Sequence, residues 1–266
     1  MRTTSLLLAS SLLLACGGST GDGTAPGAAP AATTAPTPAE RPAPPPAPTS
    51  GEGSIGFVTS LGITSAGAYF GHLEGPGYPP ECVAESTTAP DTAGPSASAG
   101  LISVDVPDTP KAMELAYDSV TQDYSQTSTG FEIPPGSTIH VHAAGSPQIP
   151  AFDADISALA PPEVTAPAAG SDVPAGDLAV SWKPTKDKFG VVLQVGTTQI
   201  RCGFDGTAGK GVIPGSLIVP ALATSDGSQP ADFFALVSHS TTTKAGSFDV
   251  AVSHAAGTPV ELHVKK

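Results

Sequence analysis

Apolar and polar side chains alternate with a period of two along much of this chain, and this pattern restricts its fold most. Each run has one apolar and one polar face, as strands of an antiparallel sheet have when one face packs on a core. The inward-facing sets are Ile139, Val141 and Ala143; Phe152, Ala154 and Ile156; Leu178, Val180 and Trp182; Phe189, Val191, Leu193 and Val195; Ile200, Cys202 and Phe204; Phe248, Val250 and Val252; and Val260, Leu262 and Val264. No helical period is sustained, and Lys111 to Asp118 is the one ambiguous run. The sequence therefore predicts an all-β fold of antiparallel β-sandwiches.

Prolines divide the strand-rich region into two halves near Ala160-Pro161-Pro162. We expect a β-rich domain at residues 53–160 and a second sandwich at residues 161–266, with Tyr78 to Ser98 as a long loop in the first. Turn signals such as Pro134-Pro135-Gly136 separate the strands. A chain of 266 residues holds either two small domains or one large one. A single two-sheet domain is therefore the alternative.

Several strand segments of the second half follow the pattern of one known family. These segments are Pro162-Glu163-Val164, Asp177 to Pro184, Gly190 to Val195, Ala245 to Val252 and the turn-like Ala255-Ala256-Gly257. Together they resemble a fibronectin type III or related immunoglobulin-like sandwich. The resemblance implies that Trp182 fills the core, and that the tyrosine-corner bond is lost because Phe248 stands where the family has Tyr. It implies a fold and no particular activity.

The N-terminus combines a positive charge, a short apolar run and a cysteine. Arg2 precedes the apolar run from Leu6 to Ala15, which Leu13-Leu14-Ala15-Cys16 closes. The run is shorter than the ~20 residues of a membrane-spanning helix, and an ordinary secretory signal needs no cysteine at this point. The arrangement resembles the lipobox of bacterial lipoproteins, which implies a signal peptide at residues 1–15, acylation of Cys16 and a lipid anchor in the cell envelope. In the common sorting scheme Gly17 in place of Asp implies the outer membrane.

Residues 16–52 differ in composition from the rest of the chain. Prolines alternate with Ala, Thr, Gly and Ser, and large apolar residues are almost missing. Such a segment cannot bury enough apolar surface to offset its conformational entropy. Its prolines favour the polyproline II conformation, which rises ~3.1 Å per residue. We expect a disordered, semi-stiff tether between the lipidated cysteine and the folded region.

The chain has three cysteines. If Cys16 carries lipid, Cys82 and Cys202 remain as an even pair outside the cytosol, where disulfides form and persist. In the chain-entropy model a bridge that closes so long a loop stabilises by about 4–5 kcal/mol. The alternative is two unpaired, buried thiols that pack as small hydrophobes. We predict a Cys82–Cys202 disulfide that couples the two halves.

Charge and motifs favour a role without catalysis. The formal charge is −13 and only 11 residues are Lys or Arg, which argues against nucleic acid as a partner because phosphate binding depends on basic side chains. Neither a nucleophile elbow nor a metalloprotease helix occurs, and no cofactor motif is present. We expect a lipoprotein that displays β-sandwiches for binding or structural roles, with the membrane and an envelope protein or glycan as partners.

The alternatives are a carbohydrate-binding protein, a metal-binding accessory protein and, with less support, a hydrolase. Carbohydrate binding usually uses exposed aromatic side chains, and the alternation places Trp182 in the core. The four tyrosines are then the remaining candidates; they are Tyr69, Tyr78, Tyr117 and Tyr124.

Two histidines and two aspartates flank the turn signal Gly145-Ser146-Pro147. The alternation places all four on the polar face of adjacent strands, with His142 opposite Asp153 and His140 opposite Asp155. Directly opposed side chains stand ~5 Å apart, which permits His–carboxylate pairing. Imidazole and carboxylate together also suit Zn²⁺. Two interpretations therefore remain, a shared metal site and, more simply, a solvated cross-strand charge pair.

Overall fold

The computed structural model describes residues 51–71, 79, 81–87, 96–109, 112–225 and 230–264, all within one compact unit. The predicted signal peptide, the lipidation site Cys16 and the tether up to residue 50 lie outside the described residues.

Across these described ranges, no helix combines the length and the apolarity needed for a membrane crossing.

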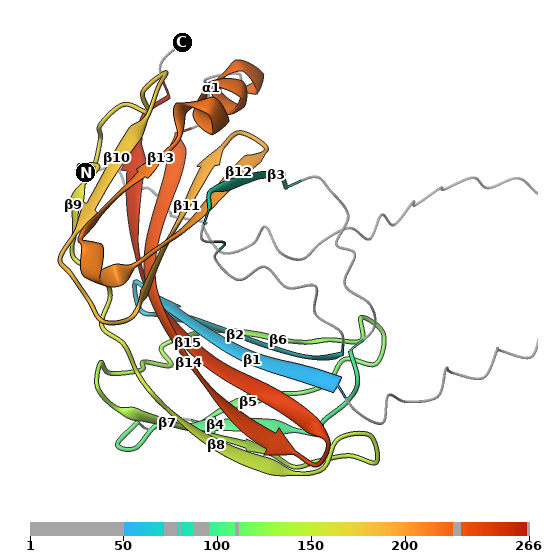
Figure 1. The fold of residues 1–266 in the computed structure, drawn as a ribbon. Coiled ribbons are helices and arrows are strands. Elements are labelled where there is room, and N and C mark those ends of the chain that lie inside the picture. Colours follow the sequence, from blue (N-terminus) through green and yellow to red (C-terminus); the bar gives the residue numbers. More distant parts are fainter. Residues whose placement is uncertain are drawn as a thin grey trace, which may run out of the picture. The chain divides into compact units, whose positions relative to one another are not determined.

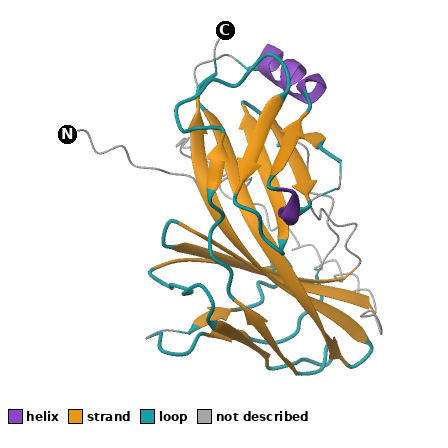
Figure 2. Cartoon of the chain, turned by 60° about the vertical axis from the view of Figure 1, so that its left-hand side comes forward, coloured by secondary structure: helices purple, strands orange, loops and turns teal. Residues whose placement is uncertain are grey.

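The described chain is mostly strand, and three sheets account for its architecture (Figures 1 and 2). The largest sheet has eight strands in the order β3 (Val83–Ser86), β12 (Thr198–Phe204), β11 (Lys188–Val195), β14 (Ala231–Ala245), β15 (Phe248–Leu262), β1 (Gly51–Ser60), β2 (Ile63–Gly71) and β6 (Tyr124–Thr129). A second sheet contains β5 (Met113–Leu115), β4 (Ile102–Asp105), β7 (Thr138–Ala143) and β8 (Phe152–Ser157). A third contains β13 (Lys210–Ile213), β10 (Leu178–Trp182) and β9 (Val164–Ala166). The predicted all-β sandwich fold is confirmed.

One long hairpin, β14–β15, belongs to both halves of the fold. Each of its strands has 15 residues, two to three times the commonest strand length, and the ladder is continuous from Ala231↔Leu262 to Ala245↔Phe248. Figure 1 shows the hairpin running from the strands around β10 and β13 to those around β4, β7 and β8. It therefore forms part of two sandwiches that share a single sheet.

Two hydrophobic cores lie along this shared sheet. In the first, β1, β2, β6 and the turn end of the hairpin face the four-stranded sheet, with Phe57, Phe70, Ile139 and Phe248 among its buried side chains. In the second, β11, β12 and the open end of the hairpin face the three-stranded sheet, and Trp182 stacks on Phe189 with ring centroids 3.8 Å apart. Trp182 is buried as the sequence predicted, and its Nε1 donates to the Gly206 carbonyl at 2.9 Å.

The expected division at residue 160 does not describe how these strands pack. Phe248, Val250 and Val252 come from the second half of the sequence but lie in the first core, so the segment around Phe248 does not pack with Trp182. The expected turn at Ala255-Ala256-Gly257 is part of β15, and Val260 and Leu262 continue the same strand. β1 pairs with β15 in parallel, whereas the other strand ladders among the described residues are antiparallel. The hairpin therefore contributes side chains to both cores.

A ten-residue helix, α1 (Gly215–Thr224), was not expected from the sequence. Pro220 lies inside it, and its own N-cap residue, Pro214, provides no side-chain bond. Asp177 supplies the missing acceptor, because its carboxylate accepts from the Gly215 N–H at 2.7 Å. Ile218 and Ala221 then bury one side of the helix in the second core. The helix therefore depends on a cap from a distant part of the chain.

Cys82 and Cys202 form a disulfide, with Cα atoms 4.1 Å apart, as predicted. Cys202 is buried in the second core, whereas Cys82 directly precedes β3. β3 has four residues and none of them is buried, although Glu85 pairs with Arg201 on β12. The disulfide thus fastens a segment from the first half of the sequence to the edge of the eight-stranded sheet.

We predict that Phe248→Ala destabilises both cores together. Phe248 is 1% exposed in the first core, and truncating such a side chain costs about 3–5 kcal/mol. The only Trp of the chain, Trp182, lies in the second core. Because the hairpin spans both cores, the denaturation midpoint followed by Trp182 fluorescence should fall. Val120→Ala, at a residue 88% exposed, is the control. An unchanged fluorescence midpoint for Phe248→Ala would show that the cores unfold independently.

Candidate functional site

The predicted His–Asp pairing occurs on the outer face of the four-stranded sheet. The β7–β8 register pairs His140 with Asp155 and His142 with Asp153. The Nδ1–Oδ1 distances are 2.6 Å and 2.7 Å, respectively. On the other side of β7, Asp105 of β4 stands opposite His140. The cross-strand register inferred from the sequence is therefore confirmed.

These four side chains do not converge on one point. Each carboxylate is directed at the Nδ1 atom of its own histidine, and the described part of the chain has no group of three or more His, Cys, Asp or Glu side chains arranged to hold a metal. The expectation that both histidines and both aspartates are ligands of one ion is thus not what the geometry shows. The aspartates orient the rings instead.

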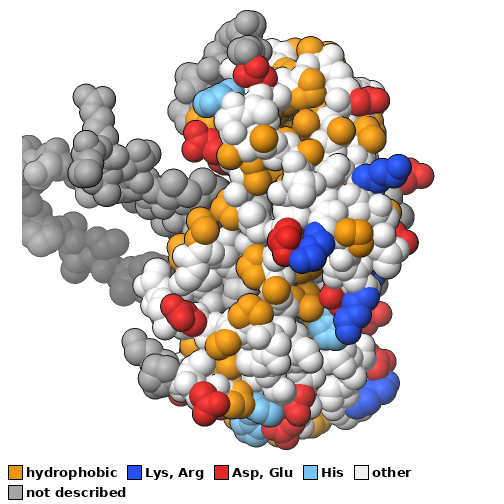
Figure 3. Space-filling model, turned by 90° about the vertical axis from the view of Figure 1, so that its left-hand side faces the viewer, with side chains coloured by type: hydrophobic (Ala, Val, Ile, Leu, Met, Phe, Trp, Pro, Cys, Tyr) orange, Lys and Arg blue, Asp and Glu red, His pale blue; other side chains and the backbone are white. Residues whose placement is uncertain are grey.

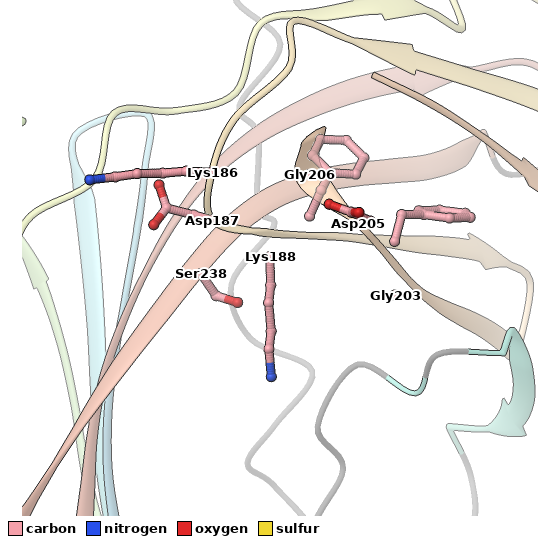
Figure 4. Close-up of a pocket in the computed structure, with 9 residues that line it drawn as sticks. Lys186, Asp187, Lys188, Gly203, Asp205, Gly206 and Ser238 are labelled. Carbon is pink, nitrogen blue, oxygen red and sulfur yellow. The ribbon is translucent and has the colours of Figure 1, made fainter. Parts of the chain in front are cut away.

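An open pocket of about 460 Å³ lies beside the second core (Figure 4). Its lining comes from the turn before β11, the start of β11, the end of β12 and the middle of β14; it comprises Lys186, Asp187, Lys188, Phe189, Gly203, Phe204, Asp205, Gly206 and Ser238. Lys188 and Ser238 are paired across β11 and β14 and lie side by side in Figure 4. The alternation predicted Phe189 and Phe204 as core residues but gave no signal for the pocket, because its lining residues come together only through strand pairing.

The two aspartates of the pocket are satisfied by local threonines. Asp205 accepts from the Thr207 N–H at 2.9 Å and from its hydroxyl at 2.8 Å, and these bonds lower the pKa of Asp205. The Thr185 hydroxyl donates to Asp187 at 3.2 Å.

The two lysines of the pocket have no such partners. Lys186 and Lys188 make no salt bridge within the described residues, whereas Lys183, Arg201 and Lys244 each pair with a carboxylate. The pocket thus offers two free ammonium groups beside occupied carboxylates.

Two of the tyrosines that were candidates for sugar binding, Tyr117 and Tyr124, make hydrogen bonds to the protein's own backbone. Tyr124 is 2% exposed; its hydroxyl donates to the Gly100 carbonyl and accepts the Ala99 N–H. The Tyr117 hydroxyl donates to the Ser96 carbonyl at 2.7 Å, and partial burial raises its pKa. Tyr69 is partly buried on β2, and Tyr78 lies outside the described residues. The tyrosines at 117 and 124 therefore anchor the segment before β4.

His254 occupies the junction of the two cores. It is fully buried and shares the inward face of β15 with Val252 of the first core and Ala256 of the second. His239 of β14 stands directly opposite. Burial, with a smaller effect of His239, lowers the pKa of His254 to about 4. The alternation through Val250 and Val252 indicates that His254 faces inward, so the sequence contained this signal.

The hydrogen bonds of His254 argue against a catalytic role. The Leu159 N–H donates to its Nδ1 at 3.1 Å, so the proton of the neutral ring lies on Nε2, which donates to the Thr59 hydroxyl at 3.3 Å. A general base that activates a hydroxyl needs the opposite tautomer, with Nε2 free to accept. The imidazole therefore satisfies a backbone N–H in the interior and does not activate Thr59.

The sequence and the fold were also compared with known proteins. No family model and no curated protein matches the chain. Among solved structures, the FN1–FN3 domains of chicken CNTN1 align with a TM-score of 0.25 and 10% sequence identity, over 82% of this chain and 66% of that chain. The aligned part thus spans just under two thirds of the matched structure. Similarity at this level does not identify a family.

We predict that His254 makes stability depend on pH between about 6.5 and 4. Its pKa is about 4 in the folded protein and about 6.5 when exposed, so in this window the unfolded chain binds more protons. The free energy of unfolding should then fall as pH drops, by at most about 1.4 kcal/mol per pH unit.

Denaturant melts across this range measure the effect. His254→Asn keeps an acceptor for the Leu159 N–H but cannot titrate, and its slope should be shallower than that of the parent. His263→Asn, at an exposed position, is the control. Equal slopes for the parent and His254→Asn would contradict the assignment.

Proposed function

We propose that this protein is a lipid-anchored component of the bacterial cell envelope, held at the outer membrane through Cys16, whose β-sandwich body has a binding or structural role. The observation that carries the proposal is the β14–β15 hairpin, which is continuous through both cores. A body without a hinge between its two sandwiches suits the presentation of a fixed surface to a partner. The proline-rich tether would place that body away from the membrane.

The side-chain chemistry of the described residues supports binding over catalysis. The imidazole and carboxylate groups of the exposed His–Asp pairs bond to each other, while the Ser103 and Thr243 hydroxyls beside them donate to backbone carbonyls. The buried histidine holds the wrong tautomer for a general base. The pocket is lined by two lysines without salt bridges in the described chain, by a serine, and by two aspartates that already accept from threonines. Polar recognition of a partner is the use that this lining fits.

The partner we propose is an envelope protein or a glycan. The net charge of −13 disfavours nucleic acid. Figure 3 shows charged side chains scattered among hydrophobic and other uncharged ones, without a basic patch on the face it draws. In this proposal Lys186 and Lys188 of the pocket contact an uncharged polar or an anionic group of the partner.

We expect Cys16→Ser to release the protein from the membrane fraction, because the acyl chains supply the membrane affinity, at ~0.8 kcal/mol per buried CH₂. Fractionation of cells that express the parent and the variant, followed by immunoblotting, measures the release. Cys82→Ser, which leaves the proposed lipidation site intact, is the control for loss of a cysteine. Full retention of Cys16→Ser in membranes would contradict the lipid anchor.

We expect Lys186→Gln with Lys188→Gln to weaken partner binding at least tenfold. Both substitutions are made in the released Cys16→Ser protein, and saturable binding to detergent-solubilised envelope is measured with and without competing envelope glycans. Lys210→Gln removes another lysine that has no salt bridge in the described region and lies outside the pocket, so its binding should be unchanged. Absence of saturable binding by Cys16→Ser would contradict the proposed binding role, and equal binding by all variants would move the contact away from the pocket.

A further inference from the structure

We propose that His140 and His142 together bind one late first-row divalent ion, such as Zn²⁺, Cu²⁺ or Ni²⁺, through their Nε2 atoms. In this proposal Asp155 and Asp153 orient the imidazole rings and are not ligands. The site lies on the outer face of the four-stranded sheet and goes beyond the proposed binding role of the protein.

Strand geometry brings the two rings to one side at a fixed spacing. His140 and His142 alternate with the buried Val141 on β7, so both side chains project from the exposed face. Two residues along a strand correspond to about 6.7 Å. Zn²⁺ binds imidazole nitrogen at about 2.0–2.1 Å, so one ion fits between the rings when they lean toward each other along the strand. β7 lies between β4 and β8, and its backbone is therefore held by ladders on both sides.

The carboxylates prepare the histidines for this role. Asp155 and Asp153 lie 2.6 Å and 2.7 Å from the two Nδ1 atoms, so in the neutral rings Nδ1 carries the proton and donates it. Each Nε2 atom then keeps its lone pair free. Histidine ligands of protein-bound metals almost always donate their other ring N–H in this way, which fixes the ring and raises its basicity. The side chains of His140 and His142 are 48% and 55% exposed, and an ion can therefore reach them from solvent.

The charge on this sheet face also favours a cation. Asp105 of β4 is the register partner of His140. His142 pairs in the same way with Ser103 of β4, and Ser103 pairs on its other side with Glu114 of β5. None of the four strands of this sheet contains Lys or Arg. The four carboxylates of the face, Asp105, Glu114, Asp153 and Asp155, therefore meet an incoming cation without a competing basic side chain on these strands.

The number and type of ligands restrict the ion. Because the described residues contain no group of three or more such ligands, water completes the coordination, and the site is open and exchangeable. Imidazole nitrogen prefers Zn²⁺, Cu²⁺ and Ni²⁺, whereas Ca²⁺ and Mg²⁺ prefer oxygen. The two-imidazole set therefore selects the late transition metals over the hard divalent ions.

Calorimetric titration of Zn²⁺ into tag-free full-length protein in detergent tests the proposal. We expect one ion per chain and at least tenfold weaker binding in His140→Gln and in His142→Gln, because each variant loses one of the two imidazole ligands. Asp153→Asn with Asp155→Asn should weaken binding 10–100-fold, the range seen when such orienting carboxylates are removed. His263→Gln, at an exposed histidine outside this sheet, should bind as the parent does.

Four results would overturn the proposal. They are the absence of saturable Zn²⁺ binding, binding unchanged by His140→Gln, two equal sites per chain that are lost one at a time, and binding of Ca²⁺ as tight as that of Zn²⁺. Because all the substituted side chains are exposed, the Trp182 fluorescence midpoint of each variant should equal that of the parent, which separates loss of a ligand from loss of the fold.

Discussion

The long β14–β15 hairpin is the constraint on which the other elements depend. Alternate residues of a strand share a face, so an unbroken ladder of 15 residues has one inward face along its whole length. The turn end of that face covers the first core and the open end covers the second. Both smaller sheets must therefore pack on the same side of the large sheet, and neither sandwich is complete without the hairpin.

Where the two cores meet, the inward face carries an imidazole in place of an aliphatic side chain. The connection from β8 to β9 passes beside this point, and the Leu159 N–H needs an acceptor there. His254 supplies the acceptor and also fills the space between Val252 and Ala256. Because the buried ring is neutral at neutral pH, its Nδ1 atom accepts from the Leu159 N–H. A second ring proton would turn this acceptor into a donor.

The two exposed sites lie on different sheets and have different charge. The outer face of the four-stranded sheet presents carboxylates and oriented imidazoles, which suit a cation. The pocket beside the second core presents Lys186 and Lys188 without salt-bridge partners in the described chain. Both arrangements present charged side chains to solvent, which is consistent with binding.

The sequence by itself determined which side chains face inward and the His–Asp register around residue 145, because a period of two and a short connection are local properties. It favoured the Cys82–Cys202 pair for a different reason, the even number of cysteines left if Cys16 carries lipid. It did not determine which strands pair, since alternation shows that one face of a strand is buried but not which element covers that face. Only the tertiary structure decided that β1 lies parallel to β15 and that Phe248 packs in the first core. Helix α1 shows the same limit, because the carboxylate that caps it comes from Asp177, 38 residues away. The pocket lysines had no local signal either, since their neighbours come from three strands that only folding brings together.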